Sequence, residues 1–156
     1  MARSTPAVAV LERAGAAFTL HPYEHDPRST AYGEEAAHAL GVPPERIFKT
    51  LVVDAGGLAV AVVPVAGSLD VKAFAAALGH KRATMADPAD AERATGYVRG
   101  GISPLGGRKR LPTVIDESAT GFPTVFVSAG RRGLQVEVTP ADLVALAGAR
   151  VAPIAA

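Results

Sequence analysis

The spacing of apolar and polar residues predicts a chain that alternates between short helices and short strands. Several stretches carry apolar residues at helical spacing, between a capping residue, often followed by proline, and a glycine that ends the helix. The first of these begins at Thr5-Pro6 and ends at Gly15. Four more predicted helices cover residues 34–40, 71–78, a short stretch that begins at Asp87-Pro88, and 141–146.

The remaining apolar residues form short β-rich runs. They cover residues 18–23, 47–54, 58–65, a short strand near 83, 112–116, 124–128 and 134–138. Residues 55–57, Ala-Gly-Gly, join two of these runs and are the strongest hairpin signal in the chain. Because the helices and strands do not follow a strict β-α-β order, we predict a mixed α/β (α+β) fold with a largely antiparallel or mixed sheet, in one domain over residues 1–156.

Composition narrows the class of protein. Of the 156 residues, 49% are hydrophobic and 20% are charged, so the chain can form a core and is unlike a disordered one. There are no cysteines, which excludes a disulfide framework, a thiolate metal site and a cysteine nucleophile. The longest apolar run, residues 58–67, is far shorter than the ~20 residues that span a bilayer. We therefore expect a cytoplasmic protein without a membrane segment.

Charge is distributed unevenly along the chain. The net charge is only +1, which gives no global field to attract a nucleic acid. Residues 12–45, however, hold six acids and two arginines, a balance of −4, whereas residues 99–132 hold six basic residues and two acids, a balance of +4. A polyanion would meet the second stretch. The alternative is that this stretch is only a solvated basic face.

Lys49 is unusual because it lies inside an apolar strand. Strand alternation places it on the same face as Leu51 and Val53. A lysine on such a face must reach water, find a partner or lose hydration energy. One interpretation is a lysine that reaches water at the strand entrance. The functional interpretation is a cation that projects into a cleft and suits an anionic or polar ligand.

Two glycine-rich segments carry most of the basic residues. In residues 99–110 the glycines let the backbone approach a ligand and expose its amides, while Pro104 restricts the loop. The segment matches neither glycine motif for nucleotide phosphates, and Ser103 has no recognisable base nearby. Residues 128–135 form a second glycine-and-arginine turn, and the two turns could line one groove. A flexible surface loop and an ordinary glycine turn are the respective alternatives.

The segment around His21 and His25 invites a metal site. In an extended chain the two histidines would lie about 13 Å apart, too far for a shared ion. His25 and Asp26 could form a base and its orienting group, but no nucleophile is identifiable. We therefore predict no metal and no cofactor. Tyr23, at the end of its strand, is better placed to hydrogen-bond in a cleft, with half-buried packing as the alternative.

Several motifs, spread over nearly the whole chain, are those of one known family. The long ones are FKTLVV at residues 48–53, GYVRGGISPLG at 96–106 and VSAGRRGL at 127–134; the short ones are YEHDP at 23–27, PVAG at 64–67, MADP at 85–88 and KRLPT at 109–113. Together they resemble the YbaK-type aminoacyl-tRNA editing family, which includes the inserted editing domain of prolyl-tRNA synthetase. The resemblance implies a curved, partly barrel-like sheet flanked by helices, in agreement with the predicted elements.

The resemblance also implies roles for individual residues. Lys49 would fix the phosphate or ribose of the terminal adenosine, and the GxxxP loop from Gly100 to Pro104 would meet the aminoacyl ester with its backbone. Gln135 stands where some members carry an aspartate, so it can hydrogen-bond but cannot act as a carboxylate base. The predicted site residues are Lys49, Gly100 and Gly101 as catalytic groups, Tyr23, Thr50, Ser103, Pro104, Ser128 and Gln135 as substrate-binding groups, and Arg108, Lys109, Arg110, Arg131 and Arg132 as tRNA-binding groups.

The function that the resemblance implies is cleavage of the ester between a wrong amino acid and the 3′ end of a tRNA. We expect a free-standing deacylase of Cys-tRNA(Pro), with Cys-tRNA(Cys) as a further substrate. An activated ester needs mainly positioning and amide donors, so the nucleophile would be the substrate thiol, a ribose hydroxyl or a water. The alternatives are a deacylase for alanine or another small amino acid, and a non-catalytic module that binds tRNA or a synthetase. Aminoacylated tRNA is the expected partner and prolyl-tRNA synthetase a further candidate, with the oligomeric state left open.

Overall fold

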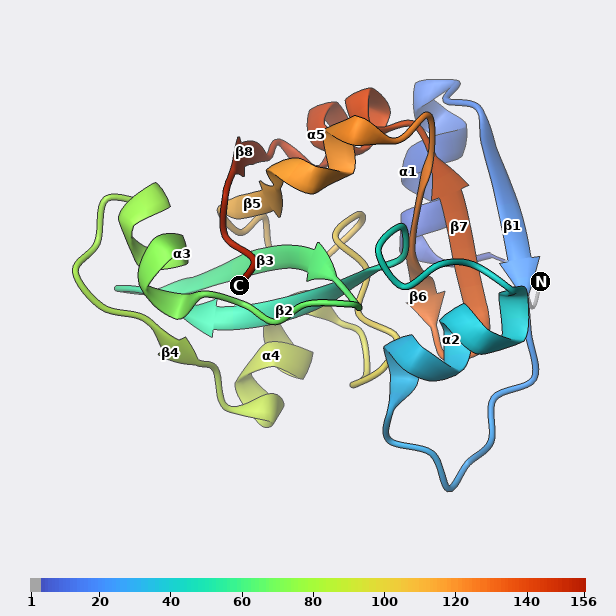
Figure 1. Ribbon diagram of the computed structural model, residues 1–156, viewed down its shortest axis with the longest axis horizontal. Coiled ribbons are helices and arrows are strands. Elements are labelled where there is room, and N and C mark those ends of the chain that lie inside the picture. Colours follow the sequence, from blue (N-terminus) through green and yellow to red (C-terminus); the bar gives the residue numbers. More distant parts are fainter. Residues whose placement is uncertain (1–3) are drawn as a thin grey trace.

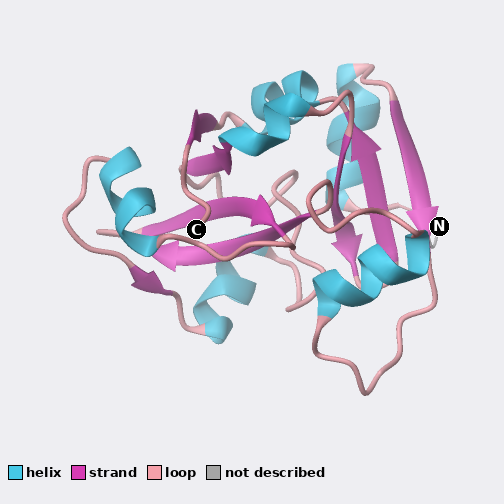
Figure 2. Ribbon diagram, in the orientation of Figure 1, coloured by secondary structure: helices cyan, strands magenta, loops and turns pink. Residues whose placement is uncertain are grey.

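The computed structural model, which describes residues 4–156, contains two sheets with helices around them (Figures 1 and 2). The first sheet is antiparallel and consists, in order, of β1 (Phe18–Pro22), β7 (Leu134–Val138) and β6 (Val125–Arg131). The second consists, in order, of β4 (Thr84–Met85), β2 (Phe48–Asp54), β3 (Leu58–Pro64), β5 (Thr113–Asp116) and β8 (Arg150–Ala152). In the second sheet β2 is antiparallel to β3 and β4, whereas β5 is parallel to β3 and β8.

The helices lie close to their predicted positions, except that the helix predicted over residues 34–40 begins at Tyr32 and the 3-10 helix over residues 117–121 is not predicted. They are α1 (Pro6–Ala14), α2 (Tyr32–Leu40), α3 (Val71–Ala77), α4 (Pro88–Thr95), the 3-10 helix η1 (Glu117–Gly121) and α5 (Pro140–Ala147). The side chains of Thr5, Asp70, Asp87 and Thr139 each accept a hydrogen bond from an amide in the first turn of the helix that follows. Helices α1, α2, α4 and α5 end at glycines in the left-handed conformation.

The two sheets join where β2 begins. Ile47 forms a parallel bridge to Phe126 of β6, and the Phe126 amide donates to the Arg46 carbonyl at 3.2 Å. The sheets therefore curve into a barrel that is only partly closed, with the three-stranded sheet on the right of Figure 1 and the β2–β3 hairpin at its centre. The prediction of a mixed α/β fold with a curved, partly barrel-like sheet flanked by helices is confirmed.

Two differences between the predicted and the observed strands have physical causes. Strand β6 continues to Arg131, three residues beyond the predicted end, because a bulge after Ser128 lets the chain pair with β7 again at Leu134. Strand β8 is not predicted, since its three residues are mostly exposed and show no apolar alternation.

The core consists of three clusters of buried hydrophobic side chains, which pack the helices against the two sheets. One packs α1 and α5 between the sheets, a second packs α3 against the five-stranded sheet, and the third packs α2 on Ile47 and Phe126. The C-terminal segment is tied down by Asp116, whose carboxylate accepts from the amides of Ile154 and Ala155, both at 2.9 Å. The elements that carry the candidate site are therefore rigidly supported.

Candidate functional site

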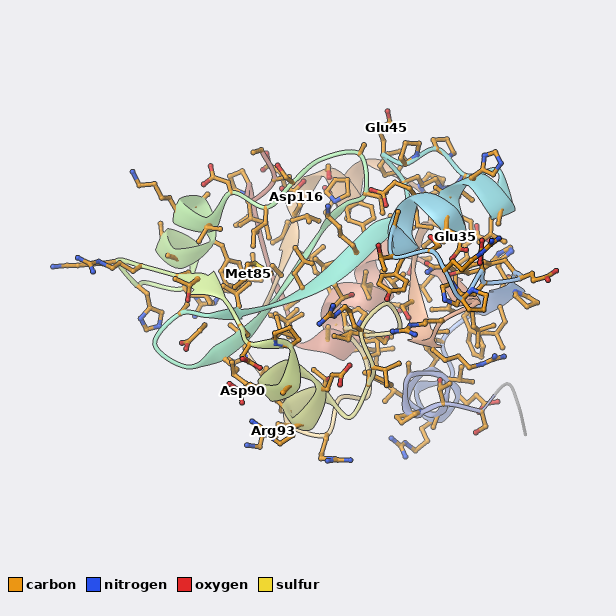
Figure 3. All side chains as sticks on the ribbon, turned by 90° about the horizontal axis from the view of Figure 1, so that it is seen from below. Glu35, Glu45, Met85, Asp90, Arg93 and Asp116 are labelled. Atoms are coloured by element: carbon orange, nitrogen blue, oxygen red, sulfur yellow. The ribbon has the colours of Figure 1, made fainter. Side chains whose placement is uncertain are left out.

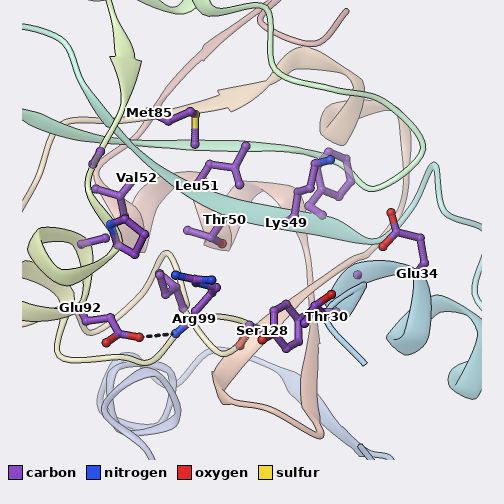
Figure 4. Close-up of a pocket in the computed structure, with 18 of the residues that line it drawn as sticks. Thr30, Glu34, Lys49, Thr50, Leu51, Val52, Met85, Glu92, Arg99 and Ser128 are labelled. Carbon is purple, nitrogen blue, oxygen red and sulfur yellow. Dashed lines mark hydrogen bonds between the residues drawn. The ribbon is translucent and has the colours of Figure 1, made fainter. Parts of the chain in front are cut away.

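A pocket of about 310 Å³ lies between the two sheets. Ile47 and residues 48–52 of β2 form one wall, and the first turn of α2 and the start of α4 form the sides. Arg99, Gly100 and Ile102 close the pocket opposite β2, with Arg99 below the strand in Figure 4. Ser128 of β6 and Gln135 of β7 reach it from the other sheet. Met85 of β4, labelled in Figures 3 and 4, lies at the rim and is 52% exposed.

Lys49 lines this pocket and is held by the backbone. Its half-buried side chain leaves β2, and its Nζ donates to the Gly67 carbonyl at 3.0 Å. Gly67 belongs to the turn that follows β3, so the contact joins two neighbouring segments. The apolar strand therefore places a cation on the pocket wall, as the functional interpretation of the sequence expects.

Two oxygen atoms at the pocket have no hydrogen-bond partner within residues 4–156. They are Oγ1 of Thr50 and Oε1 of Gln135, and both residues line the pocket. Gln135 is only 7% exposed. A buried polar atom without a partner costs about 1–3 kcal/mol, so such atoms are rare in folded proteins. A polar group bound in the pocket would recover this cost.

Tyr23 and Ser128 flank Gln135. Burial raises the pKa of the Tyr23 hydroxyl, and the nearby Gly133 backbone and Gln135 side chain only partly offset it. Tyr23 therefore remains a neutral hydroxyl at physiological pH, but it does not itself line the pocket. Ser128 does line it, and its Oγ accepts from the Gly130 amide at 3.2 Å. This bond orients the serine but leaves its proton free to donate.

The amide of Gly100 has no acceptor within residues 4–156, although both neighbouring amides do. The Arg99 amide donates to Oε2 of Glu92 at 2.9 Å, the dashed line in Figure 4. The Gly101 amide donates to the Val98 carbonyl at 2.9 Å. Gly100 itself lines the pocket and has φ +84°, a conformation that favours glycine. The loop thus fixes two amides and leaves the one between them unpaired at the pocket.

Gly101 packs the loop against the β6–β7 turn. It does not line the pocket, and its amide is already bonded to Val98. A Cβ at this position would lie 2.7 Å from Cα of Arg131, so only glycine lets the loop approach the β6–β7 turn so closely. The structure therefore separates Gly101 from Gly100, although the sequence analysis groups both as catalytic.

Ser103 and Pro104 face a different cavity. They line a space of about 430 Å³ between α1, α5 and residues 106–111. The buried Ser103 hydroxyl accepts from the Leu105 amide at 3.2 Å. The two ends of the GxxxP loop therefore line different cavities, Gly100 the first and Pro104 the second.

The two basic turns lie in different surroundings. Lys109 and Arg110 line the second cavity, and the Arg110 guanidinium lies against Gly148, the glycine that ends α5. The Arg108 side chain lies against Gly96, which ends α4. A cation at a helix C-terminus is favourable, so Arg108 and Arg110 also support the fold. The first pocket is lined by both segments, through Arg99, Gly100 and Ile102 of residues 99–110 and through Ser128 and Gln135 of residues 128–135, whereas Arg131 and Arg132 line neither cavity.

Among the lining residues that are absent from the predicted site, five are polar or charged: Thr30, Tyr32, Glu34, Glu92 and Arg99. The sequence analysis counts Arg99 only as part of the basic stretch. The sequence analysis assigns Tyr32 to neither a loop nor a helix, whereas in the structure α2 begins at this residue, two residues earlier than predicted. Their roles depend on contacts between distant segments, for which the local pattern carries no signal.

His21 of β1 and His25 of the loop that follows contact different carboxylates. Nε2 of His21 lies 2.9 Å from Oε1 of Glu137, and Nδ1 of His25 lies 2.6 Å from Oε1 of Glu35. Residues 4–156 contain no group of three or more His, Cys, Asp or Glu that could hold a metal ion. In the same residues, no helix is long and apolar enough to cross a membrane.

Comparisons with known proteins place this geometry in context. Residues 25–146 match the family model of the aminoacyl-tRNA editing domain. EbsC of Enterococcus faecalis, a candidate Cys-tRNA(Pro)/Cys-tRNA(Cys) deacylase, is 42% identical over 123 residues, which cover 78% of this chain and 75% of EbsC. YwhH of Bacillus subtilis, an uncharacterised protein, is 34% identical over 117 residues, 74% of each chain.

Solved structures show the same fold. A candidate trans-editing enzyme for prolyl tRNA synthetase is 30% identical with a TM-score of 0.84, and the match covers 98% of both chains. The hypothetical protein APE2540 is 27% identical with a TM-score of 0.86, over 97% of this chain and 100% of that one.

Proposed function

This chain belongs to the aminoacyl-tRNA editing family, and on that premise we propose that it is a free-standing deacylase that cleaves the aminoacyl ester of mischarged tRNA. The observation that carries the proposal is the unpaired Gly100 amide at a pocket that also holds Lys49. Ester cleavage develops negative charge on the carbonyl oxygen, and a preorganised amide can stabilise that charge. The loop around Gly100 is fixed on both sides, so this donor needs no reorganisation.

Lys49 would hold the tRNA end. Its ammonium group lies at the pocket wall, where a phosphate or ribose oxygen of the terminal adenosine could replace or share the Gly67 carbonyl as acceptor. The unpaired oxygens of Thr50 and Gln135 would accept hydrogen bonds from the aminoacyl group, whose α-ammonium is a strong donor. The pocket would thus grip the substrate on both sides of the scissile bond.

The amino acid that we propose is cysteine, carried on tRNA(Pro) and also on tRNA(Cys). This choice is supported by the similarity to EbsC, for which the same two substrates are named. The pocket volume of about 310 Å³ leaves room for a small side chain beside the terminal ribose. The free-standing form is supported by the similarity over almost the whole chain to a candidate trans-editing enzyme for prolyl tRNA synthetase.

The nucleophile that we propose is the thiol of the substrate itself. The chain has no cysteine, and Gln135 cannot act as a carboxylate base. The cysteinyl sulfur would bond to its own carbonyl carbon, the ester C–O bond would break, and the thiol proton would end on the ribose oxygen. The product is a cyclic thiolactone. An intramolecular attack in good orientation can lower a barrier by ~7–11 kcal/mol, so positioning by Lys49 and Gly100 would suffice.

The tRNA body would meet the basic residues outside the pocket. Lys109 and Arg110 beside the second cavity, with Arg108 next to them, offer positive charge to the phosphate backbone, and Arg131 does so from the β6–β7 turn. Arg108 and Arg110 also lie at helix C-termini, so their substitution would affect the fold as well as tRNA binding. Lys109 and Arg131 are therefore the residues at which a role in tRNA binding is simplest to test.

A deacylation panel tests the proposal. The protein is incubated with tRNA(Pro) charged in turn with cysteine, alanine, serine and proline, and with Cys-tRNA(Cys), and the remaining ester is measured over time. We expect turnover of both cysteinyl substrates, slower loss of alanine and serine, and no loss of proline beyond the uncatalysed rate. Faster loss of alanine would move the specificity to another small amino acid. Tight binding without turnover of any ester would show a non-catalytic module instead.

A further inference from the structure

We propose that Arg132 is a positioning residue, which holds the peptide between Arg99 and Gly100 so that the Gly100 amide is presented to the bound ester. The sequence groups Arg132 with the tRNA-binding cations, but the structure gives its side chain a specific partner inside the protein. The catalytic consequence rests on the proposed function, whereas the contact with the loop does not depend on it.

The contact is direct and reaches across 33 residues. Nε of Arg132 donates to the Arg99 carbonyl at 2.7 Å. The guanidinium carbon of Arg132 also lies 4.9 Å from the centre of the Tyr32 ring. Tyr32 in turn packs on Gly100, where a Cβ would lie 2.5 Å from the ring carbon Cδ1. Arg132 and Tyr32 thus support the same peptide, one by a hydrogen bond and the other by packing.

The geometry of the peptide unit turns this contact into control of the amide. In a trans peptide the C=O and N–H groups point in opposite directions. A donor fixed on the Arg99 carbonyl therefore fixes the direction of the Gly100 N–H, at a glycine that would otherwise have wide conformational freedom. The donor is charged, so it also polarises the peptide and makes the N–H a stronger donor. Glu92 fixes the preceding peptide through the Arg99 amide.

Arg131 provides the matched comparison in the same turn. Its backbone packs against Gly101, but its side chain makes no hydrogen bond or ion pair within residues 4–156. Both arginines carry the same charge and both are exposed. The loss of either one removes the same attraction for tRNA, but only the loss of Arg132 removes the donor to Arg99.

The experiment compares Arg132→Met with Arg131→Met in single-turnover deacylation of Cys-tRNA(Pro), with enzyme in excess and its concentration varied. We expect both variants to bind tRNA more weakly by a similar factor. At saturation, Arg132→Met should react about tenfold more slowly than Arg131→Met, because a hydrogen bond from a charged donor is lost only there. Tyr32→Leu should slow the reaction in the same way, and the double variant should show less than the product of the two effects.

A second readout does not need activity. In ¹H–¹⁵N spectra of the folded variants, the Gly100 cross-peak should move in Arg132→Met and stay close to wild type in Arg131→Met. A protein that deacylates no tRNA would defeat the proposed function while this spectrum still tests the contact. An unmoved Gly100 cross-peak in Arg132→Met, or equal saturated rates in the two arginine variants, would overturn the role of Arg132.

Discussion

Two buried polar side chains of this protein differ in what surrounds them. Asp116 and Gln135 are 5% and 7% exposed, and both lie on strands. The carboxylate of Asp116 accepts hydrogen bonds from three backbone amides, those of Ser118, Ile154 and Ala155. Oε1 of Gln135 accepts none within residues 4–156.

The difference contrasts a polar group that is paired within the fold with one that is unpaired at the candidate pocket. Burial of a polar group costs free energy unless it is hydrogen-bonded, so Asp116 is satisfied by the segment that it anchors. Gln135 retains that cost at a pocket beside Thr50, whose oxygen is also unpaired. We infer that substitutions at Asp116 change stability, whereas substitutions at the pocket change activity.

The largest expected effect on stability is that of Asp116→Ala. It leaves the buried Ile154 amide and the partly buried Ala155 amide without an acceptor, and we expect a loss of about 3 kcal/mol in the free energy of unfolding. Urea denaturation measures it, with Asp116→Asn as the control that keeps one acceptor oxygen. A folded Asp116→Ala protein should deacylate at the wild-type rate. An Asp116→Ala protein that is as stable as wild type but inactive would contradict the assignment of Asp116 to stability alone.

The largest expected effect on activity is that of Lys49→Met. We expect deacylation to fall about 100-fold or more, because a charged group that would hold the substrate is removed. Stability should fall by only about 1 kcal/mol, since the Gly67 carbonyl loses one donor. Rate measurements and thermal unfolding on the same sample separate the two effects. A variant that does not fold would show that the lysine is structural, and wild-type activity would show that it is incidental to the reaction.

Gln135→Met tests the unpaired residue of the comparison between Asp116 and Gln135. It removes an unpaired buried oxygen and keeps the side-chain volume, so we expect stability to stay within about 0.5 kcal/mol of wild type or to rise. The kcat/KM for Cys-tRNA(Pro) should fall about tenfold, because a hydrogen bond to the bound aminoacyl group is lost. A loss of stability like that of Asp116→Ala would show that Gln135 is satisfied in solution.

The pH dependence of stability tests how much the hydrogen-bonded carboxylate of Asp116 contributes to the free energy of unfolding. Burial alone would raise the pKa of Asp116, but hydrogen bonds from Ser118, Ile154 and Ala155 outweigh it and lower the pKa. The folded protein therefore holds this carboxylate ionised more strongly than the unfolded chain, and its contribution is present above the unfolded pKa and lost as pH falls through the folded one. Thermal unfolding between pH 7 and 3 should show a shallower decline for Asp116→Asn than for wild type.

The smallest effect is expected for Lys109→Gln. Its charge faces the second cavity and lies outside the pocket, so tRNA affinity should fall modestly and the slope of log K against log salt should fall by about one. The reaction of a minimal aminoacyl-adenosine should stay at the wild-type rate. Equal losses on both substrates would mean that Lys109 shapes the pocket.

The sequence predicts the helices and strands well because their signals are local. The Thr5, Asp70, Asp87 and Thr139 caps and the Ala-Gly-Gly turn at 55–57 each act within a few residues. The parallel pairing of β5 with β3 and β8 has no such signal, because it joins segments that are distant in the chain.

The candidate site shows the same difference between features with local sequence signals and features that depend on contacts between distant segments. Lys49 and Gly100 are found through strand alternation and the glycine loop, and the structure places both at one pocket. Ser103 is predicted to bind substrate from its place in the GxxxP loop, but it lines the other cavity. The bond from Arg132 to Arg99 joins residues from different turns, so only the folded structure distinguishes Arg132 from Arg131.

The central claim is that the pocket folds a cysteinyl ester onto itself and stabilises the developing oxyanion at Gly100. Its most direct test is a single-turnover comparison of Cys-tRNA(Pro) with Ser-tRNA(Pro), in which the first product released is trapped and identified. Serine has nearly the same size but a poorer nucleophile, so we predict a much slower reaction with serine and a cyclic thiolactone as the first product from cysteine. Equal rates, or free cysteine with no thiolactone, would contradict the account and assign the attack to a water or a ribose hydroxyl.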